Sequence, residues 1–253
     1  MSQYYRGKRT KNLFNPAAKT SFKLSRSKLD LFVNCPRCFY IDRRLGVGSP
    51  PGFPFTLNSA VDHLLKKEFD EARQRGEPHP LMRAAGIKAI PCQHEKFKDW
   101  IENFKGVQVH HKETNLLITG AIDDLWITPD QEYVVVDYKA TSKDEPVTIN
   151  APWQKAYKRQ MEIYQWLLRG NDLQVSNTGY FVYCNGQRNI PRFDSRLEFD
   201  ISLIPYVGDD SWVEACLLDA HTCLMGDKIP PITPDCDNCI YYSAVTDVIS
   251  GSC

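Results

Sequence analysis

Two acidic residues and one lysine are placed where a pair of strands could bring them together. Asp123 ends the segment Gly120-Ala-Ile-Asp, and Asp137 begins the segment Asp-Tyr-Lys139. Both segments adjoin β-branched residues, which favour strands. Alternate residues of a strand share a face, so Asp137 and Lys139 lie on the face of Val135. A charge on this face is costly to bury unless Lys139 or a metal ion compensates it.

The length of the loop between the two strands decides which upstream acid faces Asp137. If Thr128 lies opposite Glu132, a three-residue loop puts Asp123 directly across from Asp137. A two-residue loop instead brings Asp124 to the shared face. The turn sequence is compatible with both loops, so both acids are candidates at this point.

Converging carboxylates repel each other unless a cation lies between them, and hard oxygen ligands favour Mg²⁺ or Mn²⁺. Such an ion polarises a phosphoryl oxygen and lowers the pKa of a bound water, which makes a nucleophile near neutral pH. A neighbouring lysine orients that water or stabilises the charge that develops on phosphorus. The acids and Lys139 therefore indicate phosphodiester hydrolysis. The alternative is a pair of surface acids beside an exposed Asp137–Lys139 ion pair.

Two Cys-x-x-Cys pairs, Cys35/Cys38 and Cys236/Cys239, stand near opposite ends of the chain. Together they supply four thiolates, enough for one tetrahedral zinc ion or one iron–sulfur cluster. A thiol–disulfide motif would follow a strand, whereas a helix is predicted before Cys35, so a redox role is rejected. Three further cysteines are rival ligands: Cys216, Cys223 and Cys253.

Hydrophobic periodicity predicts the elements that position these residues. Helices are expected from the Ser25–Ser27 caps onward and over Thr56–Arg75, Glu95–Phe104, Pro152–Arg169 and Asp210–Met225. Strands are expected over Val107–Lys112, Leu116–Ile127, Glu132–Ala140, Thr178–Tyr183 and Arg196–Ile201, with a turn at Asn185–Gly186. This order describes an α/β core with a central mixed sheet flanked by helices, plus helical additions at the N-terminal side.

Charge is unevenly distributed although the net charge of the 253 residues is zero. Residues 1–28 carry eight basic side chains and no acid, which suits a polyanion such as DNA but also suits a solvated tail. The sequence has no apolar stretch long enough to span a bilayer and no signal-peptide core. With nine cysteines interpreted as ligands or thiols in a reducing compartment, we expect a cytoplasmic protein.

Taken in order, these residues resemble the PD-(D/E)XK nuclease superfamily, and within it the RecB-like branch with its AddB-type and CRISPR-associated exonucleases. The resemblance covers residues 21–240. It rests on Cys35-Pro-Arg-Cys-Phe-Tyr, His63 within Asn58–Leu65, Gly120–Asp123, Val135–Lys139, Gln160–Tyr164 and Cys236–Cys239. The fold that it implies is a restriction-endonuclease-like core.

The resemblance assigns a role to each matched residue. It makes Asp123 and Asp137 the metal-binding acids, together with His63, and Lys139 the catalytic lysine. Gln160 and Tyr164 would border the active site as catalytic residues, since residues four apart share a helix face. Alternatives are a surface histidine at position 63, and an ordinary packed face formed by Trp153, Tyr157, Met161 and Tyr164.

The same resemblance implies a Mg²⁺- or Mn²⁺-dependent deoxyribonuclease, with exonuclease action on single-stranded or duplex ends. Its setting would be DNA repair, recombination or defence, with a helicase or repair complex as partner and no membrane association. Cys35, Cys38, Cys236 and Cys239 would bind a [4Fe–4S] cluster, with zinc as the alternative. The usual family layout has one early and three late cysteines, and this chain departs from it. Further phosphate contacts are expected from the basic arm and from Lys155, Lys158 and Arg159.

The expected organisation is a flexible basic arm over residues 1–20, a nuclease domain over 21–240 with its ends joined by a metal centre, and a tail over 241–253. Two other classes of function fit the residues. A non-catalytic DNA-binding subunit of a repair complex would bind DNA in a salt-sensitive manner without cleaving it. A structural metal-binding protein would not bind DNA at all.

Overall fold

The computed structural model describes residues 7–52 and 55–251. The chain folds into two compact units. The larger unit comprises Pro54–Val109 and Thr119–Asp210, and the smaller comprises Met1–Phe53, His110–Ile118 and Ser211–Cys253. The division passes through two strands, β3 (Val107–His111) and β4 (Leu116–Gly120).

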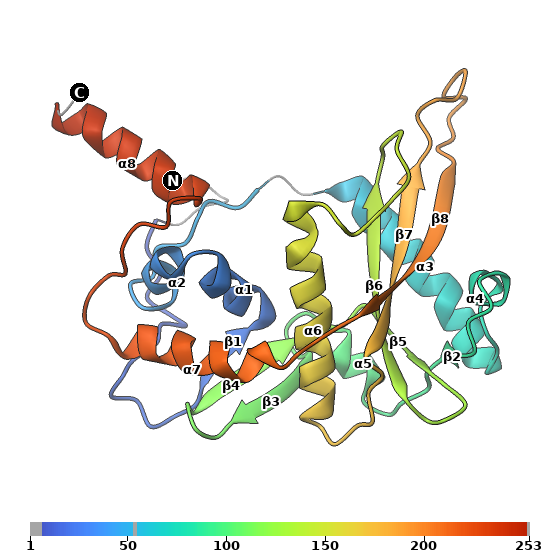
Figure 1. Cartoon of the computed structure of the whole chain (residues 1–253), viewed down its shortest axis with the longest axis horizontal. Helices are drawn as coiled ribbons and strands as arrows, with labels where there is room; N and C mark the ends of the chain where they lie inside the picture. Colours follow the sequence, from blue (N-terminus) through green and yellow to red (C-terminus); the bar gives the residue numbers. More distant parts are fainter. Residues whose placement is uncertain (1–6, 53–54, 252–253) are drawn as a thin grey trace. The chain divides into compact units, whose positions relative to one another are not determined.

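A five-stranded mixed sheet forms the centre of the larger unit, as predicted (Figure 1). In spatial order its strands are β2 (Ile90–Pro91), β5 (Asp124–Ile127), β6 (Tyr133–Thr141), β7 (Thr178–Gly186) and β8 (Phe199–Val207). β6 and β7 are parallel, and the other neighbours are antiparallel. The helices are α3 (Thr56–Arg75), α4 (Pro80–Ala84), α5 (Phe97–Trp100) and α6 (Lys155–Arg169), with the 3-10 turn η1 (Pro152–Gln154) before α6.

Alternation along β6 separates a core face from a second face that carries polar groups. Val136 and Tyr138 belong to a buried cluster that includes Phe69 of α3. Burying each such large side chain contributes roughly 1.5–3 kcal/mol. The intervening residues, Val135 and Asp137, point to the other face, on which α6 packs. Figure 1 shows α3 and α6 on either side of β6.

The hairpin between β5 and β6 has the three-residue loop. The backbone N–H of Thr128 donates to the Glu132 carbonyl at 3.0 Å and closes this loop. Asp124 is paired with Val136. Continuing this register by one residue places Asp123 across from Asp137, so the odd-length loop is the correct alternative.

The structure corrects three predicted elements. Leu116–Ile127 is not one strand, because β4 ends at Gly120 in one sheet and β5 begins at Asp124 in another. Asp123 therefore lies in the break between strands. Asn185–Gly186 is not a turn, because pairing with β8 continues until Gly186 lies opposite Phe199. The helix expected over Glu95–Phe104 is the single turn α5.

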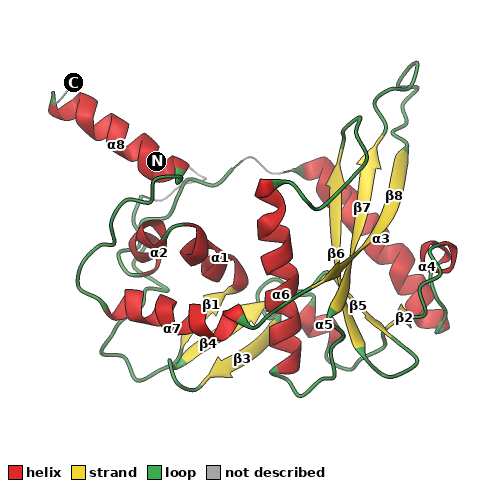
Figure 2. Cartoon of the chain, viewed as in Figure 1, coloured by secondary structure: helices red, strands yellow, loops and turns green. Residues whose placement is uncertain are grey.

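The smaller unit contains β1 (Phe22–Ser25) in a sheet of order β1-β4-β3, and four helices. These helices are α1 (Arg26–Asn34), α2 (Pro36–Arg43), α7 (Trp212–Met225) and α8 (Asp237–Ser250). Figure 2 shows α8 as a continuous helix where a tail was expected. Across the described residues, no helix combines the length and apolar character that a membrane crossing requires.

Part of the basic arm is attached to the smaller unit. The Arg9 guanidinium pairs with the Asp42 carboxylate, and the buried Phe14 donates its backbone N–H to the Arg43 carbonyl at 2.8 Å. Burial opposes ionisation of Asp42, but Arg43 and Lys28 hold its pKa below the ordinary value. The predicted flexible arm is thus fixed at these two points, while its first six residues lie outside the described range.

Candidate active site

A cavity of about 370 Å³ opens in the larger unit where α3, β6 and α6 meet. Polar side chains and aromatic rings share its wall. The residues that line it are Phe55, Asn58, Ser59, Val61, Asp62, Leu65, Lys66, Asn103, Asp123, Tyr138, Lys139, Ala140 and Tyr157. Asp123 and Lys139, two of the residues predicted for catalysis, therefore face one cavity.

Asp137 lies behind this wall with no exposed surface. Its carboxylate contacts the ammonium group of Lys139, whose side chain is 14% exposed. Burial raises the pKa of Asp137 to about 7; Lys139 opposes this shift, and Asp123 adds to it. The positive charge of Lys139 does not fully offset the effect of burial, so Asp137 takes up a proton at a higher pH than an ordinary aspartate does.

Asp123 is held at the break before β5, and its carboxylate lies beside that of Asp137. One oxygen accepts the backbone N–H of Tyr138 at 3.1 Å, and the other lies 3.4 Å from Lys66 Nζ. The two acids thus converge on one side of the sheet. This is the geometry that the predicted metal site requires.

Asp124, the other acid considered, serves a different purpose. It is buried on the opposite face, where it pairs with Arg73 and accepts a hydrogen bond from the Tyr138 hydroxyl at 2.6 Å. Burial raises the pKa of Asp124, and Arg73 opposes the shift. Asp124 is part of a buried ion pair and not of the cavity.

Gln160 and Tyr164 of α6 lie beside Asp137. Gln160 Nε2 donates to Asp137 Oδ1 at 2.8 Å and to the Tyr164 hydroxyl at 3.2 Å. Tyr164 is buried and packs closely against Gly120, where a Cβ atom would come within 2.7 Å of its ring. Gln160 orients Asp137, and the small residue at position 120 leaves room for the tyrosine.

His63 is not brought to the cavity. It is exposed on α3 and is not among the described residues that line the cavity. Asp62 and Lys66 present their side chains there instead, as Asn58 does one turn earlier. These three recur every four residues, so they share a helix face. That spacing is a signal in the sequence that could have identified Asp62 and Lys66, which were missed.

Lys66 connects the helix to the acids. Its ammonium group lies 3.0 Å from Asp62 and 3.4 Å from Asp123. Burial opposes a charge on Lys66, but Asp123 and Asp62 raise its pKa above the ordinary value. Lys66 is therefore a second permanent cation in the cavity, beside Lys139.

Tyr157 of α6 is a further residue that the sequence did not identify as functional. Its ring centroid lies 4.7 Å from Lys139 Nζ, within the range of a cation–π interaction. This contact and the ion pair with Asp137 hold the ammonium group of Lys139 from two sides.

The donor set of the cavity suits a hard divalent cation. Asp123 and Asp137 offer adjacent carboxylate oxygens, the ligands that Mg²⁺ and Mn²⁺ prefer. A cation between them would also offset the burial of Asp137 and the repulsion from Asp123, which together raise the pKa of Asp137. The predicted third ligand, His63, does not complete this set, because no three-ligand group outside the cysteines is formed by the described residues.

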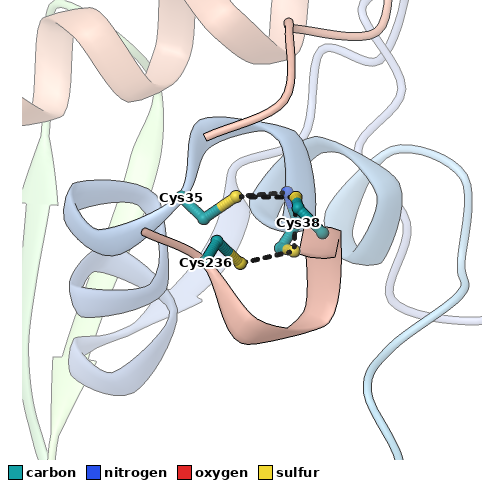
Figure 3. Close-up of side chains that lie close together, drawn as sticks. Cys35, Cys38 and Cys236 are labelled. Carbon is teal, nitrogen blue, oxygen red and sulfur yellow. Dashed lines mark hydrogen bonds between the residues drawn. The ribbon is translucent and has the colours of Figure 1, made fainter. Parts of the chain in front are cut away.

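The four cysteines of the smaller unit come together as predicted. Figure 3 shows three of them, Cys35, Cys38 and Cys236. Their sulfur atoms all lie within 4.8 Å of one another, with Cys35–Cys239 and Cys38–Cys236 both at 3.6 Å. Within the described part of the chain, Cys216 and Cys223 do not join this group, and Cys253 lies outside that part.

Local structure explains how the sulfurs converge. Cys35 and Cys236 are the N-cap residues of α2 and α8, so each Cys-x-x-Cys pair occupies the first turn of a helix. Cys35 Sγ accepts the Cys38 backbone N–H at 3.3 Å. Burial opposes ionisation of Cys35, but hydrogen bonds from Thr233 and Cys38 lower its pKa to about 7. A thiolate, the form that binds metals, is thereby favoured.

Comparison with known proteins gives one family. A model of the PD-(D/E)XK nuclease superfamily matches residues 54–243, more than half of the chain. No curated protein matches the sequence. A solved structure titled "Crystal structure of SSO0001" shares 14% identity over 89% of this chain and 86% of that chain, with a TM-score of 0.43.

Proposed function

Because the chain belongs to the PD-(D/E)XK nuclease superfamily, we propose that it is a metal-dependent nuclease that hydrolyses phosphodiester bonds of DNA. Asp123 and Lys139 line one cavity, and the buried carboxylate of Asp137 lies directly behind them; this arrangement carries the proposal. Asp123 and Asp137 would hold Mg²⁺ or Mn²⁺. When bound, such an ion polarises the scissile phosphoryl group and acidifies water.

The residues of the chain divide the remaining work. Lys139, fixed between Asp137 and Tyr157, is placed to hydrogen-bond the attacking water or the developing negative charge. Lys66 supplies a second cation for phosphate oxygens. Gln160 keeps the Asp137 carboxylate in one orientation through its 2.8 Å hydrogen bond.

We further propose that the protein acts as an exonuclease on DNA ends, in repair, recombination or defence. Within the superfamily, we propose that it belongs to the RecB-like branch. The motifs quoted from the sequence support this branch, while the cysteines depart from its usual layout of one early and three late. Lys155 and Lys158 of α6 would contact backbone phosphates.

The spacing of the four cysteines supports a single tetrahedral ion. Thiolates bound to one zinc at about 2.3 Å stand about 3.8 Å apart, and the observed sulfur separations include 3.6 Å and 3.8 Å. In a [4Fe–4S] cluster each thiolate binds a different iron, so the sulfurs stand farther apart. We therefore propose zinc at Cys35, Cys38, Cys236 and Cys239, with the iron–sulfur cluster as the alternative.

Degradation of labelled DNA tests the proposed activity. Purified protein should shorten linear single-stranded or duplex DNA with Mg²⁺ or Mn²⁺, and EDTA should abolish the reaction. Lys139→Ala should lower the rate by about 100-fold or more, as removal of one charge-stabilising group typically does. Lys98→Ala, an exposed lysine on α5, is the matched control and should be unaffected.

Other outcomes would redirect the assignment. Undiminished cleavage by Lys139→Ala would overturn the assigned site. Salt-sensitive DNA binding without cleavage under any divalent ion would favour a non-catalytic DNA-binding subunit. Cleavage of a closed single-stranded circle would contradict exonuclease action, because a circle has no ends.

A further inference from the structure

Trp153 is unusual because an aromatic residue faces solvent while its polar neighbour is buried. The Trp153 side chain is 61% exposed, whereas Gln154 is 1% exposed. The other four tryptophans are buried or half-buried. Exposing a large ring costs the chain the free energy that burial would provide, so a ligand that covers the ring would recover it.

The turn that presents Trp153 is held rigidly by Gln154. Gln154 Nε2 donates to the Thr148 carbonyl at 2.6 Å, and Gln154 Oε1 accepts the Ala151 backbone N–H at 2.8 Å. Pro152 adds a fixed backbone dihedral within the same turn. The indole is therefore placed before any ligand arrives, which lowers the entropic cost of binding.

Trp153 is connected to the cavity through one ring. Its ring centroid lies 5.5 Å from that of Tyr157 at an interplanar angle of 85°, and Tyr157 lines the cavity and contacts Lys139. A second exposed ring, Phe55, lies in the cavity wall with 78% of its surface accessible. Two exposed aromatic rings thus stand at the candidate active site.

Cations accompany these rings. Lys66 and Lys139 line the cavity, and the exposed Lys155 follows Trp153 by two residues. A protein partner would favour a continuous apolar patch, whereas separate aromatic rings among basic groups match a strand of nucleic acid. The bases stack on the rings, and the phosphates meet the lysines.

We propose that Trp153 is a stacking platform for an unpaired base of the DNA strand that enters the cavity, with Phe55 as a second platform. The inference rests on the proposed function and deepens it by naming the substrate as a single-stranded end. A base inside a duplex has both faces covered by neighbouring base pairs, whereas every base of a single strand can offer a face to the ring, so the platform favours unpaired DNA.

Binding measured in EDTA tests this inference without requiring cleavage. Fluorescence anisotropy of a labelled single-stranded oligonucleotide should show about 5- to 100-fold weaker binding by Trp153→Ala than by the unchanged protein. Trp153→Phe should restore most of the affinity. Trp100→Phe, at a buried tryptophan, is the control. Blunt duplex of the same length should bind both Trp153 variants and the unchanged protein equally.

An abasic substrate gives the decisive comparison. Removing the bases of the terminal nucleotides should weaken binding to the unchanged protein more than binding to Trp153→Ala, since one of the two stacking rings is already absent from the variant. Equal losses with both proteins would overturn the inference, as would full affinity of Trp153→Ala for single strands. If the protein fails to cleave DNA but its binding still depends on both Trp153 and the bases, the proposed nuclease activity is overturned and the stacking inference is not.

Discussion

Asp137 has a carboxyl group without exposed surface, next to a second carboxyl group and one lysine. On β6, the ammonium group of Lys139 faces both acids. A second ammonium group, that of Lys66 on α3, contacts Asp123. Burial raises the pKa of Asp137, and the neighbouring Asp123 adds to this shift, so the protonated form is favoured. The preference disfavours the empty carboxylate pair and favours cation binding.

Metal affinity should therefore rise with pH. A carboxyl group with a pKa of about 7 is mostly protonated at pH 6 and mostly ionised at pH 8, and a proton competes with the metal for Asp137. Mn²⁺ binding measured by calorimetry should weaken by about tenfold for each pH unit below 7 and level off above 8. Asp137→Asn should bind weakly at every pH. A flat profile for the unchanged protein would contradict this prediction.

Lys66 offers a second test at the level of one side chain. Lys66→Met keeps the apolar stem but removes the cation near Asp123, so we expect the rate of DNA cleavage to fall by about 10- to 100-fold. Lys67→Met, at the exposed neighbouring position, should leave the rate unchanged. If Lys66→Met cleaves DNA as fast as Lys67→Met and the unchanged protein, Lys66 serves only its ion pairs and not the reaction.

Residue identity could be predicted where a motif carries it. Asp123, Asp137 and Lys139 follow from strand alternation and from the family pattern, and the structure brings them together. His63 illustrates the limit, because a histidine attracts attention as a ligand whatever face of the helix it occupies. The polar residues Asn58, Asp62 and Lys66 recur every four positions and predict the cavity-facing side of this helix better, since helical spacing decides which side chains share a face.

At the scale of elements, α3 and β5 are joined by a buried network. Arg73 of α3 pairs with Asp124, and it also donates to the Cys92 carbonyl at 2.7 Å and the Leu125 carbonyl at 3.2 Å. The Tyr138 hydroxyl completes the network from β6. These contacts fix the helix that carries Lys66 against the strands that carry the acids.

Breaking this network should destabilise the fold strongly. Asp124→Asn leaves the buried Arg73 guanidinium with only the half-exposed Asp70 as a counter-charge, and losing the buried partner of such a pair costs up to about 3–5 kcal/mol. Denaturant unfolding should show this loss as a lower midpoint. Replacing both partners, Arg73→Met with Asp124→Leu, should cost less than the single change, because no uncompensated charge is left. A double variant that is less stable than Asp124→Asn would refute this account.

Element boundaries were predicted well where one face is apolar and poorly where the chain changes sheets. Thr56–Arg75 was predicted as a helix with both ends correct, since its apolar stripe runs its whole length. Leu116–Ile127 was predicted as one strand because its residue types favour strands throughout. Only the long-range pairing of β4 and β5 in different sheets creates the break at Asp123.

For the whole molecule, the two compact units contain different chemistry. The larger unit holds the cavity, and the smaller holds the four cysteines. Cys38 and Cys236 are separated by 198 positions in the sequence, yet their sulfurs lie 3.6 Å apart. The intervening chain includes the whole of the larger unit. Such long-range convergence could be predicted here only from the pairing of two Cys-x-x-Cys motifs.

Metal at the four cysteines should act as a cross-link of the smaller unit. Closing a loop of 198 positions in the unfolded chain removes conformational entropy equivalent to about 5 kcal/mol in the chain-entropy model. Cys236→Ser should therefore lose bound metal and lower the unfolding temperature of the smaller unit, followed by calorimetry and elemental analysis. The control is Cys223→Ser, because Cys223 lies near Pro36 but outside the ligand group.

Zinc predicts a colourless protein with about one ion per chain, whereas visible absorption with about four irons would establish the cluster instead. Because Asp123 and Asp137 are proposed to bind a separate ion, metal retained by Cys236→Ser must be assigned by adding a second substitution, Asp137→Asn. If the double variant still holds one equivalent, neither site is the one that binds it.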